Sequence, residues 1–128
     1  MDANERKHIN ELFKQVVGAC FEVSNVLGAG FLEKVYERAL IEELCMQGIH
    51  AEAQVPIEVR YKDIVVGQYL ADVLVEGKLI VELKCCESLC DEHLAQCLNY
   101  LKATGYSIAL LVNFQKPKLE WRRIVSKF

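Results

Sequence analysis

Three segments of the chain carry apolar residues at every third or fourth position, which predicts amphipathic helices. We expect these helices over residues 3–27, 31–47 and 87–104. Gly28, Gly48 and Gly105 follow them, and glycine commonly ends helices because it adopts the left-handed backbone conformation without strain. Ser88 or Asp91 is available as the N-cap of the third helix. The first two helices should form one helical hairpin or bent pair.

The rest of the chain shows alternating apolar residues or short apolar runs, which predict strands. We expect strands over residues 55–61, 64–67, 69–75, 79–85, 107–114 and 119–125, with a short helix as the alternative for the last segment. A bulge is expected at Gly67, and Pro56 favours a sheet edge for the first strand. Segment 79–85 is apolar on both faces, which indicates a central strand. The helix over 87–104 should form a right-handed crossover to the next strand.

Three charged residues interrupt the apolar strands between Tyr69 and Lys84. Asp72 lies in Ala-Asp-Val-Leu-Val, and Glu82 and Lys84 lie in Leu-Ile-Val-Glu-Leu-Lys-Cys. Burying a charge is costly unless the charge is paired or bound to a metal ion. The pattern therefore indicates a paired or metal-binding group of side chains rather than solvated surface.

The Glu-Gly dipeptide at 76–77 predicts a turn between antiparallel strands, in which opposite positions sum to about 153 or 154. Asp72 then lies near Val81 or Glu82, and Glu82 and Lys84 point to one face. Two neighbouring carboxylates repel unless a divalent cation lies between them, and oxygen ligands favour magnesium, manganese or calcium. Lys84 would orient or deprotonate a water, or stabilise charge on a phosphate. The alternative is a surface hairpin with a Glu82–Lys84 ion pair.

Composition indicates one ordinary domain over residues 1–128, since the 128 residues are 52% hydrophobic and 26% charged. The opening sequence, MDANERKHINELFK, lacks the apolar core of a signal peptide, and no run approaches the ~18 apolar residues of a membrane span. We therefore expect a cytoplasmic protein with no membrane association. Its six cysteines should then be reduced thiols rather than disulfides.

The net charge of −3 argues against tight binding of nucleic acid through charge alone. The chain from residue 102 onward is nevertheless basic, with Glu120 as its single acid. Its cations are Lys102, Lys116, Lys118, Arg122, Arg123 and Lys127. Acidic metal ligands would also contribute to the negative total. The charge therefore lowers the expectation of a nuclease without excluding it.

The spacing of Asp72, Glu82 and Lys84 resembles the Asp and Glu-x-Lys signature of the PD-(D/E)XK nuclease superfamily. Segment 28–40, GAGFLEKVYERAL, resembles the signature of the GxxExxY proteins, a small group placed in that superfamily. The resemblance covers about residues 12–125. It implies an α/β fold with a restriction-endonuclease-like core, in which a mixed central sheet has the helical pair on one side and the third helix on the other.

The resemblance also implies a site for Mg²⁺ or Mn²⁺. Its ligands would be the carboxylates of Asp72, Glu82 and Glu33 and the backbone carbonyl of Leu83. Glu37 is a competing candidate for the helix acid, because residues four apart lie on one side of a helix. Glu33 has a simpler alternative, since an acid in the first turn stabilises a helix through its dipole.

The remaining site residues are polar or aromatic. The resemblance implies that Lys84 steadies the water or the scissile phosphate and that Gln96, in HLAQCLNYLK, positions substrate or the lysine. Tyr100 lies four residues from Gln96 and shares its face, although a solvated polar face is the alternative. Tyr36 is either a substrate contact or a core aromatic with a satisfied hydroxyl.

A rival site is the cluster of Cys85, Cys86, Cys90, His93 and Cys97, which raises the alternative of a zinc or iron–sulfur centre. The spacing does not match a Cys-x-x-Cys knuckle. Adjacent Cys85 and Cys86 point to opposite faces of a strand, and Cys90 and Cys97 fall on the apolar stripe of the third helix. We therefore favour structural thiols.

Two functions fit these residues. The first is a metal-dependent nuclease that hydrolyses phosphodiester bonds of DNA in preference to RNA. Arg122 and Arg123 would contact the nucleic acid, or would simply cover the sheet together with Trp121. The second is a catalytically inactive module of the same fold that binds nucleic acid or a partner protein. The chain has no obvious added recognition domain, and a homodimer would supply the missing contact surface.

Overall fold

The computed structural model describes residues 1–126 and contains one five-stranded sheet in the order β1-β2-β3-β4-β5. β3 and β4 run parallel and the other neighbouring strands are antiparallel, so the sheet is mixed, as expected. The strands are β1 (Ala51–Tyr61), β2 (Ile64–Val75), β3 (Leu79–Lys84), β4 (Ile108–Asn113) and β5 (Glu120–Val125). The helices are α1 (Ala3–Leu27), α2 (Glu33–Met46) and α3 (Asp91–Thr104).

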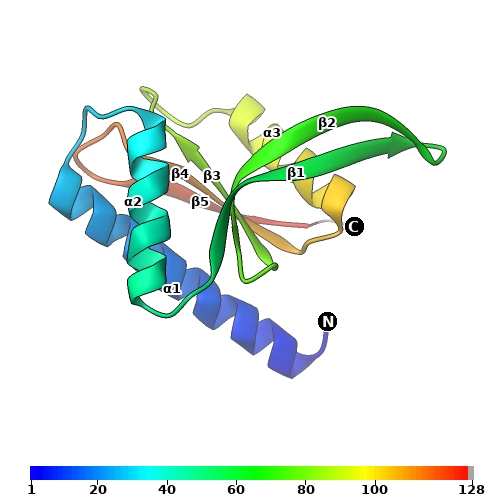
Figure 1. Ribbon diagram of the computed structural model, residues 1–128, viewed down its shortest axis with the longest axis horizontal. Helices are drawn as coiled ribbons and strands as arrows, with labels where there is room; N and C mark the ends of the chain where they lie inside the picture. The colour runs from blue at the N-terminus through cyan, green and yellow to red at the C-terminus, as the bar shows by residue number, and fades with distance from the viewer. Residues whose placement is uncertain (127–128) are drawn as a thin grey trace.

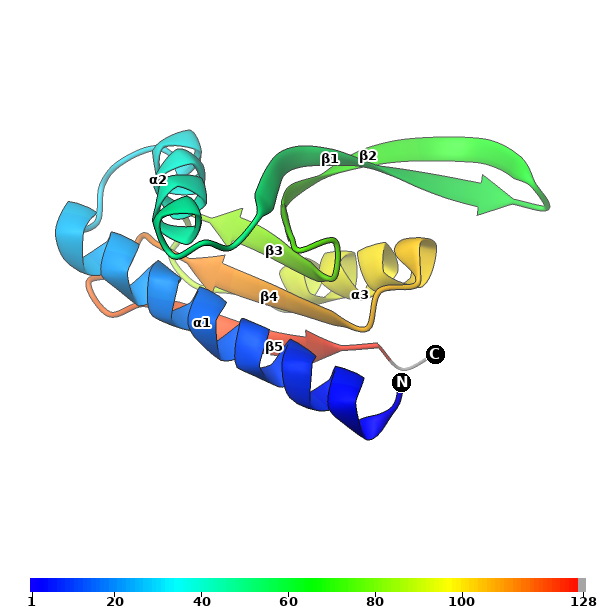
Figure 2. The same cartoon turned by 60° about the horizontal axis from the view of Figure 1, so that its bottom comes forward.

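Helices cover both faces of the sheet (Figure 1). α1 and α2 pack on one face and α3 on the other, which confirms the expected layers (Figure 2). Along β3, Val81 and Leu83 belong to the α1/α2 layer and Ile80 belongs to the α3 layer. Because side chains alternate along a strand, Glu82 and Lys84 face α3. Within residues 1–126, no helix combines the length and the apolar character needed to cross a membrane.

The third helix begins at Asp91 rather than at residue 87, and the N-cap is neither Ser88 nor Asp91. Cys90 is the N-cap, and its backbone N–H donates to Nδ1 of His93 at 3.2 Å. The expectation of a serine or aspartate cap was therefore wrong. An imidazole three residues into the helix satisfies the backbone donor instead.

A buried asparagine holds the loop between β3 and α3 and explains the late start of the helix. Asn113 is fully buried; its Nδ2 donates to the carbonyl of Cys86 at 2.9 Å, and its Oδ1 accepts from the N–H of Cys86 at 3.1 Å. Its Nδ2 also donates to Oε1 of Glu120 at 3.1 Å, and the same Glu120 oxygen accepts from the N–H of Leu89 at 3.1 Å. These bonds keep residues 86–89 out of the helix.

β1 and β2 form a long hairpin that leaves the body of the sheet and arches over α3 (Figures 1 and 2). β2 pairs with β3 only from Val75 to Val73, opposite Leu79 to Val81, in the register expected from the turn. The predicted bulge falls one residue before Gly67, because Val59 pairs with Gly67 and Arg60 pairs with Val65. β1 forms a sheet edge, as its proline indicated.

Tyr36 lies in the core and closes the loop between α1 and α2. Its side chain is fully buried and its ring stacks on Phe114 at 4.7 Å between centroids. Its hydroxyl donates to the carbonyl of Gly28 at 2.6 Å and accepts from the N–H of Phe31 at 3.2 Å. Gly30, within this loop, has a φ of +114°, which a side chain would strain. Tyr36 therefore has no surface to offer a substrate.

We predict that Tyr36→Phe lowers the free energy of unfolding by about 1–2 kcal/mol, because two part-buried backbone groups lose their partner while the ring packing is kept. Urea unfolding followed by circular dichroism measures the change. Tyr61→Phe, at the exposed tip of the hairpin, is the control and should leave stability unchanged. Equal stability of the Tyr36 variant and the wild type would contradict the role of the hydroxyl.

Candidate active site

The candidate site lies where β2 separates from β3. The N–H of Leu83 has no β2 carbonyl to bond at this point and donates instead to Oδ2 of Asp72, at 2.9 Å. The N–H and C=O of one residue in a strand point to the same edge, so the Leu83 carbonyl also points into this opening. The opening thus combines a carboxylate and a main-chain carbonyl, both of which are hard oxygen donors.

Glu82 projects from β3 into the α3 layer beside Asp72. Its side chain is only 3% exposed, and its Oε1 is buried without a hydrogen-bond partner among the described residues. The pKa of Glu82 is raised to about 9, mainly by burial and further by the neighbouring Asp72 carboxyl, whereas the Lys84 ammonium lowers it. Without a cation, the two carboxyls can satisfy each other only by sharing a proton. A divalent cation fits this pair, because it would supply the partner that Oε1 lacks.

Lys84 and α3 complete the polar group on this face. Nζ of Lys84 donates to Oε1 of Gln96 at 3.3 Å, which joins the end of β3 to the helix. Tyr100 lies one turn further along α3, and its pKa is raised to about 12 by burial and then by Glu82 and Asp72. Its hydroxyl therefore stays protonated near the two acids.

The structure does not place Glu33 with these residues. Glu33 is exposed at the start of α2, which packs on the opposite face of the sheet. Its charge acts on Cys85, whose pKa is raised mainly by burial and further by Glu33. Within residues 1–126, no three His, Cys, Asp or Glu side chains are placed to hold one metal ion. The expected group of three converging acids is therefore a pair, Asp72 and Glu82. The first-turn position of Glu33 is that of a residue which stabilises its helix.

Glu37, the competing helix acid, has partners of its own. Its side chain is buried at the contact between α2 and β1. It accepts hydrogen bonds from Nζ of Lys34 at 2.9 Å and from Nε2 of Gln54. The Lys34 ammonium supplies the positive charge that two acids on one side of the helix require. The two hydrogen bonds also keep Glu37 away from the opening beside Asp72.

The cysteines are free thiols throughout the chain. Burial raises the pKa of Cys97 to about 12, and burial is also the first cause of the raised pKa values of Cys85 and Cys86. Among the side chains that the structure describes, no three thiols or imidazoles lie in positions that could hold one metal ion. His93 is already engaged as the partner of the Cys90 N–H.

The two predicted substrate arginines lie on opposite faces of β5. Arg122 pairs with Leu111 of the α3 layer and has Glu120 at 3.8 Å, so it shares a face with the acids. Arg123 faces α1, donates to Asn10 at 2.6 Å and lies over the ring of Phe13. Only Arg122 of this pair shares the face of the site. Lys127, part of the expected basic end, lies outside the described residues.

Two residues near the site, Tyr69 and Asn113, were not predicted from the sequence. The ring of Tyr69 lies 5.8 Å from that of Tyr100, which brings the hairpin to the edge of the site. Tyr69 and Ala71 are two residues apart and therefore lie on the same face of the strand. This spacing could have predicted that Tyr69 faces α3. Asn113 is a polar residue at the end of an apolar strand. A polar side chain in such a strand indicates a buried group that needs partners, as it did for Asp72.

We predict that metal-free protein loses stability as the pH rises from about 4.5 to about 9, because the folded state then holds a proton on Glu82 that the unfolded chain has released. Glu82→Gln removes this contribution, so its advantage in unfolding free energy over the wild type should grow across that window. Urea titrations in a chelator at several pH values measure it. Glu42→Gln, an exposed acid of α2, is the control and should follow the wild type. Parallel profiles for Glu82→Gln and the wild type would contradict the burial of an unpaired carboxyl.

Comparisons with known proteins agree with this architecture. No protein with a curated description matches the sequence significantly. The solved structure of SSO0001 superimposes with a TM-score of 0.57 at 18% identity, over 97% of this chain and 62% of that one. An alkaline exonuclease from Laribacter hongkongensis, LHK-Exo, superimposes with a TM-score of 0.51 at 14% identity, over 85% of this chain and 76% of that one. At such identities these two structures show a shared fold. The family model described as the PD-(D/E)XK nuclease superfamily matches residues 10–124, and the chain therefore belongs to that superfamily.

Proposed function

We propose that the protein is a metal-dependent nuclease that hydrolyses phosphodiester bonds, in DNA rather than RNA. The observation that carries the proposal is the buried Oε1 of Glu82, which has no partner among the described residues although the Glu82 carboxyl neighbours Asp72. Membership of a nuclease superfamily and the structural likeness to an exonuclease support this function. A buried carboxylate without a partner is costly, and a bound cation removes that cost.

The proposed ligands are the carboxylates of Asp72 and Glu82 and the carbonyl of Leu83. These oxygens suit Mg²⁺ or Mn²⁺, and divalent metals are generally used by nucleases of this superfamily. When bound, the cation would polarise the phosphate and lower the pKa of the attacking water. Glu33 is not among the proposed ligands, because it lies near Cys85 rather than beside Asp72 and Glu82.

The chain's own polar groups would orient the reaction. The Lys84 ammonium would lie against the phosphate and stabilise the negative charge that develops on it. Gln96 holds Lys84 through the 3.3 Å hydrogen bond and thereby sets its direction. Asp72 keeps its carboxylate fixed through the N–H of Leu83. A preorganised group of this kind reduces the reorganisation needed during the reaction.

We infer a finer assignment to the GxxExxY group from segment 28–40. In it, Tyr36 closes the loop that carries Gly30, and Glu33 opens the helix that follows. The second candidate function is a catalytically inactive module, which is favoured by the presence of two rather than three converging acids within residues 1–126. The two functions differ in whether the acid pair binds a cation.

We predict that purified protein with Mn²⁺ cleaves DNA and that Asp72→Asn or Glu82→Gln reduces the rate at least about 100-fold, since each removes a charge that holds the cation. Lys84→Met should reduce cleavage by a similar factor. Calorimetry should show that Mn²⁺ binding is lost in the two acid variants and kept in Lys84→Met, because an ammonium is not a ligand. Glu42→Gln is the control and should cleave as the wild type does.

Two other outcomes would contradict the proposed nuclease function. Cleavage that survives both acid substitutions would assign the activity to a contaminant or to another site. Absence of cleavage together with absence of Mn²⁺ binding would establish the inactive module.

A further inference from the structure

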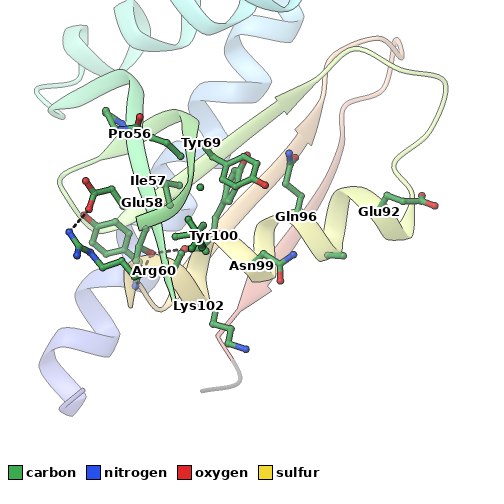
Figure 3. Close-up of a pocket in the computed structure, with 18 residues that line it drawn as sticks. Pro56, Ile57, Glu58, Arg60, Tyr69, Glu92, Gln96, Asn99, Tyr100 and Lys102 are labelled. Atoms are coloured by element: carbon green, nitrogen blue, oxygen red, sulfur yellow. Dashed lines mark hydrogen bonds and ion pairs between the residues drawn. The ribbon is translucent and has the colours of Figure 1, made fainter. Parts of the chain in front are cut away.

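A groove runs between the β1–β2 hairpin and α3 (Figure 3). Its volume of about 1330 Å³ exceeds the ~300–1,000 Å³ typical of small-molecule pockets. One wall is formed by residues 56–60 and 66–69 of the hairpin, and the other by α3 and the chain that follows it. Gln96 and Tyr100 belong both to this wall and to the candidate site. Through these two residues the groove adjoins the place where a phosphodiester would be cleaved.

The groove presents an aromatic ring and amide groups near that site. Tyr69 is 51% exposed, and its ring approaches Tyr100 across the groove. Figure 3 shows Tyr69 on the hairpin side, with Gln96 and Asn99 on the helix side. Aromatic faces stack on unpaired bases, and amides hydrogen-bond to base edges. These groups suit a nucleic acid whose bases are unstacked.

The charges that line the groove argue against a duplex. Arg60 and Lys102 are offset by Glu58 and Glu92 among the described lining residues, and Arg60 already pairs with Glu58 at 2.8 Å. A duplex keeps its bases stacked inside and offers mainly phosphates, whose binding requires an excess of Lys and Arg. A single strand offers base faces that do not need that excess. The groove therefore favours single strands over duplexes.

We propose that this groove binds one single strand of nucleic acid and leads it to Asp72 and Glu82, with a base stacked on Tyr69. The proposal rests on the proposed nuclease function, because it names the substrate class of the same site. Tyr69 is a binding residue in this scheme and takes no part in the chemistry. Its neighbour Leu70 is equally exposed, at 50%, but points to the other face of the hairpin and does not line the groove.

Binding can be measured apart from cleavage. Fluorescence anisotropy in a chelator would titrate the protein against a labelled 15-nucleotide single strand of mixed sequence and against the matching duplex. We expect the single strand to bind at least about 10-fold more tightly than the duplex. Tyr69→Ala should weaken single-strand binding about 10-fold, as expected for one lost base stack, whereas Tyr69→Phe keeps the ring and should bind normally. Leu70→Ala is the matched control, and circular dichroism verifies that each variant is folded.

Salt dependence gives a second measurement. Arg60 and Lys102 line the groove, and Lys84 lies at the proposed cleavage site. With these three cations facing the strand, log affinity for the single strand should fall against log salt with a slope of about −2.1 or shallower. A steeper slope, equal affinity for the duplex, or equal effects of Tyr69→Ala and Leu70→Ala would overturn the proposal. If the wild type cleaves nucleic acid but its affinity does not depend on Tyr69, the proposed groove binding is wrong and the proposed nuclease function stands. If single-strand binding depends on Tyr69 but no cleavage occurs, the groove binding stands and the nuclease function is wrong.

Discussion

The site depends on the separation of two strands. β2 and β3 pair for three residues and then part, and the carboxylate of Asp72 takes the place of a main-chain acceptor for the N–H of Leu83. A buried backbone donor left unpaired would be costly, so this bond allows the strands to diverge without that loss. The divergence has two effects. It opens space beside Glu82, and it frees the hairpin to cross above α3.

The burial of Glu82 works against stability in the metal-free protein. Burial raises the pKa of Glu82 to about 9; the Asp72 carboxyl raises it further, and the Lys84 ammonium lowers it. The surrounding apolar layers of the sheet hold the carboxyl in place. Functional sites commonly carry such locally unfavourable arrangements, because the fold as a whole provides the stability to hold them. Here the unfavourable element is one carboxyl, and the stabilising elements are the two helical layers.

Much of the fold could be predicted from hydrophobic spacing, because the helices and strands have clear periods and glycine stops. The extent of α1, the β2–β3 register and the central place of β3 all follow from the sequence. The start of α3 could not be predicted, since it depends on Asn113, a residue of a later strand. The closeness of Asp72 and Glu82 could also be predicted, because continuing the register beyond the last strand pair brings them opposite each other. The position of Glu33 and the reach of the hairpin depend on how whole layers pack, which local patterns do not contain.

The hydroxyl of Tyr36 gives a physical meaning to the spacing of glycine, glutamate and tyrosine in segment 28–40. It ties down a connection between two helices, on the far layer from the acid pair. A chain that lost Asp72 and Glu82 during evolution would still be stabilised by these two hydrogen bonds. In a relative recognised through that spacing alone, the spacing therefore indicates the fold. Whether such a relative can bind a metal ion has to be judged from the residues of its β2 and β3.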